Sequence, residues 1–303
     1  MRLSSFASTT LLVTALLALS ACAAKKHVYV EQPVDALYNT AMNDIDNGNY
    51  KDAVSAFQAV ERQHPYSVWA TKAQLMEAYA QYERNKYDEA ISALDRFIQL
   101  HPGNRDTPYA YYLKGLCYYE QISDVGRDQQ MTRDALHTFQ EVVDRFPDSK
   151  YATDAHLKVQ LARDHLAGKD MAIGRYYEKQ GDYLAALNRF KRVVTRYQTT
   201  THVPEALERM VEVYVALGLV NDARRTAAVL GYNYPGSIWY QYAYRLLRTG
   251  QPGTATFDPD AAIDWIPGVG PSHSAPTAPS TVALPKPKPA KDADDSGWFG
   301  WLW

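Results

Sequence analysis

Residue types that catalyse reactions or bind metals are present in this chain, but they form no catalytic pattern. The 303 residues include 8 histidines and 2 cysteines. His64 and His101 each stand directly before a proline in similar phrases, whereas His156 and His165 are scattered. Carboxylate pairs, Ser-His arrangements, regular metal-ligand spacings and glycine-rich phosphate loops are all missing from the sequence. We therefore expect a protein without catalytic residues, metal or cofactor.

Cys22 is the residue whose surroundings predict covalent chemistry. Arg2 and the apolar run from Leu11 to Leu19 are typical of an export signal, and the run is too short to span a bilayer. The phrase Leu19-Ser20-Ala21-Cys22 resembles the lipobox of bacterial lipoproteins. This resemblance implies a signal peptide at 1–21, a lipidated linker at 22–34, and diacylglycerol and a fatty acyl group on Cys22. Because Ala23 rather than aspartate follows, it also implies a lipid anchor in the outer membrane, facing the periplasm. An incidental cysteine at a cleavage site is the alternative.

Five short segments that repeat the same spacing of two residues predict the fold. Each contains a small residue, and a second residue, usually bulky, follows four positions later. The pairs are Ala53 and Phe57, Ala90 and Leu94, Ala135 and Phe139, Ala186 and Phe190, and Ala223 and Ala227. This pattern is typical of the second helix of a tetratricopeptide unit, where a small side chain lets two antiparallel helices approach closely. We predict an all-α tetratricopeptide repeat solenoid of about five helix pairs with a closing helix, over residues 35–249.

The alanines are spaced 37, 45, 51 and 37 residues apart, against about 34 in the usual repeat, so units three and four carry insertions. The first insertion covers roughly 122–131. The second lengthens a helix from about Tyr151 to Lys179, with Gly168 and Gly174 as weak points. Cys117 has no disulfide partner once Cys22 is lipidated, and we expect it to be a buried, inert thiol.

The last 54 residues differ in composition from the rest. Residues 250–303 are rich in proline and small polar residues, which predicts a disordered tail. Three tryptophans between Trp298 and Trp303 suggest an element that docks on a membrane interface or a partner groove, although a tail without function is the alternative. Without Arg2 and the charged residues of the tail, 28 basic and 28 acidic residues remain. A neutral folded part is a poor nucleic-acid binder, so we expect no nucleic acid as a partner.

The first helices of units one to three carry a stripe of large apolar and aromatic residues at spacings of three, four or seven. Its members are Tyr38, Met42, Leu75, Tyr79, Tyr82, Tyr112, Leu116 and Tyr119. In tetratricopeptide proteins these helices line the concave face, so the stripe could form a peptide-binding groove for a chain with an aromatic end. The alternative is that the stripe is core between neighbouring helices.

Several motifs together resemble the BamD family, the lipoproteins of the β-barrel assembly machine. They are the lipobox, the five-unit count, the run from Ala93 to Pro102, the phrase from Tyr111 to Leu116, Arg127-Asp128, and the run from Tyr176 to Gly181. The resemblance covers about residues 33–250. The tail and Gln198, which replaces a helix-ending proline, depart from it.

The resemblance implies a subunit that promotes the insertion of proteins into the outer membrane. Its first repeats would bind C-terminal signals of unfolded outer-membrane protein clients. Its last repeats would bind the periplasmic domains of BamA, and other lipoproteins of the machine are further partners that it suggests. On this basis we expect a partner-binding stretch formed by Arg175, Tyr176, Tyr177, Glu178 and Lys179.

Two other function classes are open on the sequence. One is a different periplasmic tetratricopeptide scaffold, which coordinates cell-wall synthesis with envelope constriction. The other is a cell-wall hydrolase whose repeats position a catalytic domain. The lipobox and the number of units favour the assembly machine over the first, and the few residues left outside the repeats argue against the second.

Overall fold

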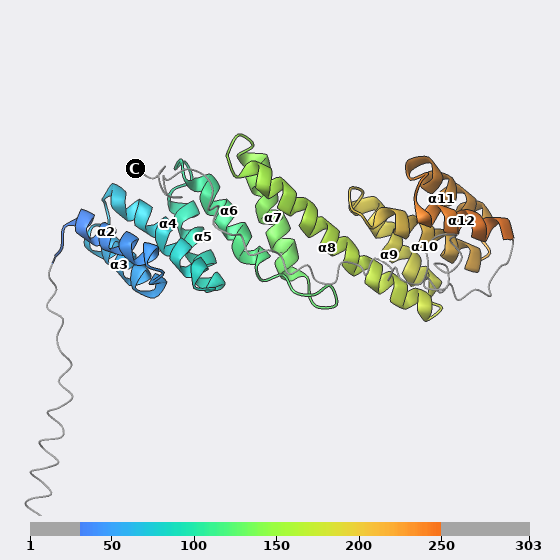
Figure 1. Ribbon diagram of the computed structural model, residues 1–303, viewed down its shortest axis with the longest axis horizontal. Coiled ribbons are helices and arrows are strands. Elements are labelled where there is room, and N and C mark those ends of the chain that lie inside the picture. Colours follow the sequence, from blue (N-terminus) through green and yellow to red (C-terminus); the bar gives the residue numbers. More distant parts are fainter. Residues whose placement is uncertain (1–30, 250–303) are drawn as a thin grey trace, which may run out of the picture. The chain divides into compact units, whose positions relative to one another are not determined.

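The computed structural model describes residues 31–249. The predicted signal peptide, the lipidation of Cys22 and the predicted disordered tail lie outside these residues. The described chain forms two compact units, which meet in sequence between Lys86 and Tyr87. Within the described residues every regular element is a helix, and the elements are shown in chain order in Figure 1.

The first unit contains three helices, which are α2 (Val34–Asp46), α3 (Tyr50–Gln63) and α4 (Val68–Glu83). Helix α3 packs against both α2 and α4. Gly48 turns the chain between α2 and α3 with a φ of 72°, a left-handed conformation that glycine adopts without steric cost. Ser67 begins α4, and its side chain accepts a hydrogen bond from the backbone N–H of Ala70 at 3.0 Å.

The second unit contains the remaining eight described helices. They are α5 (Tyr87–Leu100), α6 (Thr107–Tyr119), α7 (Gln130–Arg145), α8 (Ala152–Lys179), α9 (Tyr183–Arg196), α10 (Val203–Ala216), α11 (Val220–Asn233) and α12 (Ile238–Thr249). From α5 to α11 each helix packs against the next along the chain, and α12 packs against both α10 and α11. The predicted all-α fold of tetratricopeptide helix pairs with a closing helix is confirmed.

The phased alanines are buried where the prediction needs them. All five are fully inaccessible to solvent, as are four of their partners, which are Phe57, Leu94, Phe139 and Phe190. Within the second unit, Phe190 joins Met171, Val211 and Leu230 in one apolar core. Because a methyl group is the only side chain at each alanine position, the neighbouring backbone can come close enough to bury these rings.

Helix α8 runs for 28 residues without interruption, which confirms the lengthened helix. The helix is continuous through Gly168 and Gly174, and their weakness within it stays a prediction. A Cβ atom at Gly174 would lie 2.4 Å from the ring of Phe190, and one at Gly115 would lie 2.6 Å from the ring of Phe139. Gly115 and Gly174 are therefore places where a phenylalanine of the following helix packs directly on the backbone.

Cys117 lies inside α6 and is fully buried, as expected. Burial raises the pKa of its thiol to about 12, so the reactive thiolate is scarce at neutral pH. In the part of the chain that the structure describes, none of the helices has the length and apolar character that crossing a membrane requires.

Candidate binding surfaces

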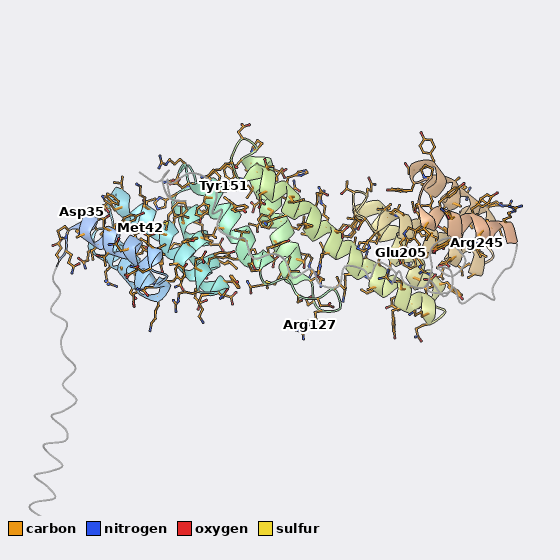
Figure 2. The ribbon with its side chains drawn as sticks, in the orientation of Figure 1. Asp35, Met42, Arg127, Tyr151, Glu205 and Arg245 are labelled. Atoms are coloured by element: carbon orange, nitrogen blue, oxygen red, sulfur yellow. The ribbon has the colours of Figure 1, made fainter. Side chains whose placement is uncertain are left out.

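The predicted groove residues of the first unit divide into buried and half-buried side chains. Tyr38 is only 3% exposed, with its ring centroid 5.6 Å from that of Phe57 and 4.8 Å from that of Trp69. Leu75 is also buried. Met42, labelled on α2 in Figure 2, is half-buried. Tyr38 and Leu75 therefore act in the core, and Met42 retains surface that another molecule could contact.

Tyr79 and Tyr82 of α4 are the half-buried aromatic residues of the same stripe. The hydroxyl of Tyr79 hydrogen-bonds the carboxylate of Glu83, and burial together with this carboxylate raises the pKa of Tyr79 above its ordinary value. Burial also raises the pKa of Glu83. The surface of α4 thus offers phenol rings beside a carboxyl group that is partly withdrawn from water.

The three predicted groove residues of the second unit lie on α6, next to the start of α8. Tyr112 is half-buried, stacks on Tyr151 with ring centroids 5.2 Å apart, and donates a hydrogen bond to Asp154 Oδ2 at 2.7 Å. Leu116 and Tyr119 are buried. Tyr112 is therefore held in a fixed orientation by both a ring and a carboxylate.

A cation lies beside this aromatic group. Lys158 Nζ is 4.9 Å from the ring centroid of Tyr119 and 3.5 Å from Asp154 Oδ2. A cation over an aromatic face is attracted by the ring quadrupole. The α6 and α8 surface thus combines half-buried rings with a positive charge, two features that suit a peptide with an aromatic residue at a free carboxylate end.

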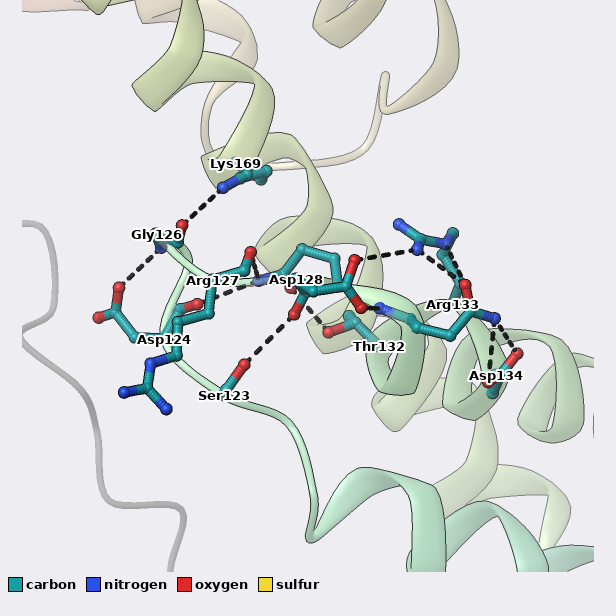
Figure 3. Close-up of polar contacts among 11 residues, drawn as sticks. Ser123, Asp124, Gly126, Arg127, Asp128, Thr132, Arg133, Asp134 and Lys169 are labelled. Atoms are coloured by element: carbon teal, nitrogen blue, oxygen red, sulfur yellow. Dashed lines mark hydrogen bonds and ion pairs between the residues drawn. The ribbon is translucent and has the colours of Figure 1, made fainter.

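The first insertion forms the loop between α6 and α7. Figure 3 shows how its backbone is tied to α8, where Lys169 Nζ donates to the carbonyl of Gly126 at 2.9 Å. His165 Nε2 lies 2.9 Å from the carbonyl oxygen of Ser123. Within the loop, Asp124 Oδ1 accepts from the N–H of Gly126 at 2.7 Å. The insertion is thus a loop that hydrogen bonds hold against α8, and its Arg127 is exposed to solvent.

The predicted partner-binding stretch forms the C-terminal end of α8. Tyr176 is 61% exposed and Lys179 is exposed, whereas Tyr177 packs against the apolar core. Arg175 Nη1 donates to Glu205 Oε1 of α10 at 2.7 Å. Figure 2 marks Glu205 on α10. The stretch therefore has two outward side chains, Tyr176 and Lys179, and two charged ones that face α10.

Glu178 belongs to a group of charged side chains that sequence reasoning did not identify. Its carboxyl group hydrogen-bonds that of Glu212 on α10, and Glu205 and Glu208 lie on the same helix. Arg209 is in the middle of the group, with Nη1 2.8 Å from Glu212 Oε2. We call Glu178, Glu205, Glu208 and Glu212 the carboxylate cluster.

The carboxylate cluster is largely withdrawn from water. Burial, assisted by the charge of Glu212, raises the pKa of Glu178 to about 8. Burial also raises the pKa of Glu212, and it raises that of Glu208 well above its ordinary value. Two carboxyl groups that hydrogen-bond each other must share a proton, because a carboxylate alone is only an acceptor. At neutral pH the cluster therefore holds protons.

Comparison with known proteins establishes the family. The family model YfiO, described as outer membrane lipoprotein, matches residues 30–230. The chain belongs to this family. It is 55% identical over 221 residues to outer membrane protein assembly factor BamD of Caulobacter vibrioides, covering 73% of this chain and 72% of that protein.

Two further relatives carry the same name. The protein from Rickettsia prowazekii is 47% identical over 236 residues, which cover 78% of this chain and 94% of the relative. The one from Neisseria meningitidis serogroup A is 36% identical over 245 residues, which cover 76% and 92%. The resemblance to the BamD family is thus confirmed, and the matched region contains both the α6 and α8 aromatic surface and the carboxylate cluster.

Proposed function

We propose that this chain is a non-catalytic outer-membrane protein assembly factor, anchored by lipid on Cys22 at the periplasmic face of the outer membrane. Its membership of a family whose relatives are named as such factors, at up to 55% identity among those compared, carries the proposal. The helix-hairpin fold supports it, because stacked hairpins provide binding surface rather than a catalytic centre.

The half-buried aromatic residues bind the client. In this proposal an unfolded outer-membrane protein places its aromatic C-terminal end against Tyr79 and Tyr82 on α4 or against Tyr112 on α6. Lys158 supplies a positive charge near the terminal carboxylate. The buried members of the stripe, such as Tyr38 and Tyr119, belong to the cores of their units and are not part of the proposed site.

A peptide titration tests the client site. A fluorescent peptide ending in an aromatic residue is titrated with the intact protein, and with the variant carrying both Tyr79→Ala and Tyr112→Ala. We expect binding to weaken roughly ten-fold or more, since truncation of an aromatic anchor commonly costs over about 1 kcal/mol. Tyr66→Ala is the matched control, because Tyr66 is fully exposed in the first unit. Equal affinity of the double variant and the wild type, with the helical circular dichroism intact, would remove the client site from these residues.

The end of α8 binds the assembly partner. In this proposal the periplasmic domains of BamA contact Tyr176 and Lys179, whose side chains face solvent. The variant with Tyr176→Ala and Lys179→Ala should co-purify with less BamA, while Tyr232→Ala, at another exposed tyrosine of the second unit, should not. Undiminished co-purification would show that the partner binds elsewhere.

Lipid anchoring of Cys22 is tested by mass spectrometry of the membrane-extracted protein. The expected product begins at Cys22 and carries the mass of a diacylglycerol and one further acyl chain. A mature chain that begins at another residue, or an unmodified cysteine, would refute the anchor.

A further inference from the structure

The carboxylate cluster has more negative charge than its surroundings neutralise. Arg209 lies close to all four members, with Nη1 2.8 Å from Glu212 Oε2 and 3.9 Å from Glu178 Oε2. Its Nε lies 3.7 Å from Glu205 Oε1 and 3.9 Å from Glu208 Oε2. Arg175 adds a second guanidinium at Glu205. Four carboxylates against two guanidinium groups leave two negative charges in excess when every group is ionised.

Several basic residues of the neighbouring helices are engaged with other partners. On α9, Arg189 and Arg192 both pair with Asp170 of α8, at 3.1 and 3.2 Å. On α11, Arg225 pairs with Asp222 at 2.6 Å. Helix α12 places Tyr242 within electrostatic reach of Glu208, and Arg245 lies against the ring of Tyr242, 6.0 Å from its centroid.

Glu208 marks the interior end of the cluster. Its side chain is 1% exposed, and its Oε2 atom has no hydrogen-bond partner among the described residues. A buried polar atom without a hydrogen bond costs about 1–3 kcal/mol, and such atoms are rare in folded proteins. The other three carboxyl groups reach the surface, with side-chain exposures between 14% and 17%. The cluster is therefore a set of carboxyl groups that is closed on the inside and accessible at one edge.

The chemistry of the cluster selects an organic cation. Among the described residues, no group of histidine, cysteine and acidic side chains has the arrangement that holds a metal ion. The guanidinium of Arg209 stands between the carboxylates, where a divalent ion would be repelled. A guanidinium or ammonium group at the edge formed by Glu178 and Glu212 would instead donate charge-assisted hydrogen bonds to both carboxylates.

We propose that the carboxylate cluster receives a basic side chain from the protein that binds the C-terminal end of α8, and that this side chain displaces a proton held between Glu178 and Glu212. The inference rests on the proposed partner role of that helix end, because Glu178 lies between the exposed Tyr176 and Lys179. The displaced proton goes from the carboxyl group to solvent, and the resulting carboxylate pairs with the incoming cation. In the free protein the proton neutralises charge that the partner neutralises in the complex.

Proton release makes the inference measurable. Titration calorimetry of the full protein with purified periplasmic domains of BamA, in buffers of different ionisation enthalpy at pH 7, should show release of about one proton per complex. Affinity should also rise between about pH 6.5 and pH 8, since displacing the proton becomes easier as pH increases. Glu178→Gln keeps the shape and hydrogen bonding of the protonated acid, so the fold should survive. This variant should bind roughly ten-fold more weakly or worse, and without proton release.

A matched control separates this site from general electrostatics. Asp222→Asn makes the same carboxyl-to-amide change in the same unit, at an exposed ion pair, and should leave both affinity and proton release unchanged. If the wild type binds and neither its proton release nor its affinity depends on Glu178, the inference is overturned and the partner role stands. If the wild type does not bind the BamA domains at all, the proposed partner role fails, and the inference fails with it.

Discussion

The protons held by the carboxylate cluster should make the stability of the second unit fall as pH rises. Glu178 has a pKa of about 8 in the folded protein, against an ordinary value of 4.5. Between these two values the folded state holds a proton that the unfolded state has lost. Stability from this group is therefore complete below about pH 4.5, and it is lost as pH rises through about 8.

The size of the effect follows from proton linkage. One extra proton on the folded state changes the free energy of unfolding by about 1.4 kcal/mol per pH unit. From about pH 6 to about pH 7.5 the second unit should therefore lose roughly 2 kcal/mol through Glu178. The glutamine side chain introduced by Glu178→Gln does not titrate, so the variant should lack this part of the pH dependence. The free energy of unfolding of the variant, relative to that of the wild type, should therefore increase with pH.

Amide hydrogen exchange is the suitable assay, because it reports on α8 and α10 separately from the first unit. The quantity to compare is the opening free energy of their slowest amides, in the wild type and in Glu178→Gln, at three pH values. Asp222→Asn is again the control and should follow the wild type. Parallel pH profiles for the wild type and Glu178→Gln would show that Glu178 is not protonated in the folded state, and the reasoning about stored protons would be refuted.

Three other predictions concern packing and reactivity. Gly174→Ala should lower the melting temperature by roughly 2–4 °C, since overpacking against the buried ring of Phe190 costs about 2 kcal/mol and the higher helix propensity of alanine returns about 1 kcal/mol. Thermal unfolding followed by circular dichroism measures this, and an unchanged or higher melting temperature would contradict the close contact. Lys169→Ala should speed amide exchange around Gly126 while changing global stability by less than about 0.5 kcal/mol, and unchanged exchange would mean that the hydrogen bond does not hold the loop. Cys117 should resist a thiol reagent at pH 8 and react once denaturant is added, as located by peptide mass spectrometry; rapid labelling of the native protein would show that its thiol is accessible.

Much of the fold could be predicted from the sequence because a local pattern specifies it. Each helix hairpin needs a small residue where its helices touch, and Ala53, Ala90, Ala135, Ala186 and Ala223 satisfy this at full burial. The interactions that form a hairpin lie close together in sequence, so the spacing of the alanines and of their partners four residues later is enough to identify the hairpins. The lengthened α8 was also predictable, since the spacing of the alanines required extra residues at that point.

The role of the glycines was less accessible from sequence. Gly174 lies inside α8, five residues before its last residue, where glycine weakens an isolated helix, so propensity alone predicts a weak point. The structure shows the competing effect, because the ring of Phe190 occupies the volume that a side chain would fill. A glycine preceding a phased phenylalanine by 16 residues, or by 24 as in Gly115 and Phe139, is a signal visible only after the hairpins are known.

The aromatic stripe illustrates a different limit. Residues that are three or four positions apart share a helix face, yet that face can meet both a neighbouring helix and solvent. Tyr38 and Tyr79 both belong to the stripe, but Tyr38 is enclosed by Phe57 and Trp69, while Tyr79 is half-buried. The spacing in the sequence identifies which residues share a helix face. How exposed each side chain is depends on how the neighbouring helices pack against that face.

The carboxylate cluster left a signal in the sequence that could have been noticed. Glu205, Glu208, Arg209 and Glu212 are spaced by three, four and seven positions, which puts them on one side of α10. On a surface helix such a row is an ordinary solvated face. The row on α10 is buried because α8 and α12 lie next to it. Glu178, which precedes Glu205 by 27 positions in the sequence, joins the cluster from α8. Contacts of that kind are set by tertiary packing and have no local pattern.

Stability alone does not explain why charged groups occupy this position. Replacing a buried ion pair with apolar side chains of similar volume is often neutral or stabilising by about 1–4 kcal/mol, because the desolvation of charges opposes their attraction. The buried phenylalanines at Gly115 and Gly174 show that the same unit can fill the space between helices with rings. A cluster that excludes most water, retains excess carboxylate and leaves Glu208 Oε2 without a hydrogen bond is costly in the isolated protein. A proton held by the cluster offsets part of that cost in the free protein, and a positive charge from a partner would offset it in the complex. The basic side chain of a partner is therefore the simplest physical reason for four glutamates around one arginine.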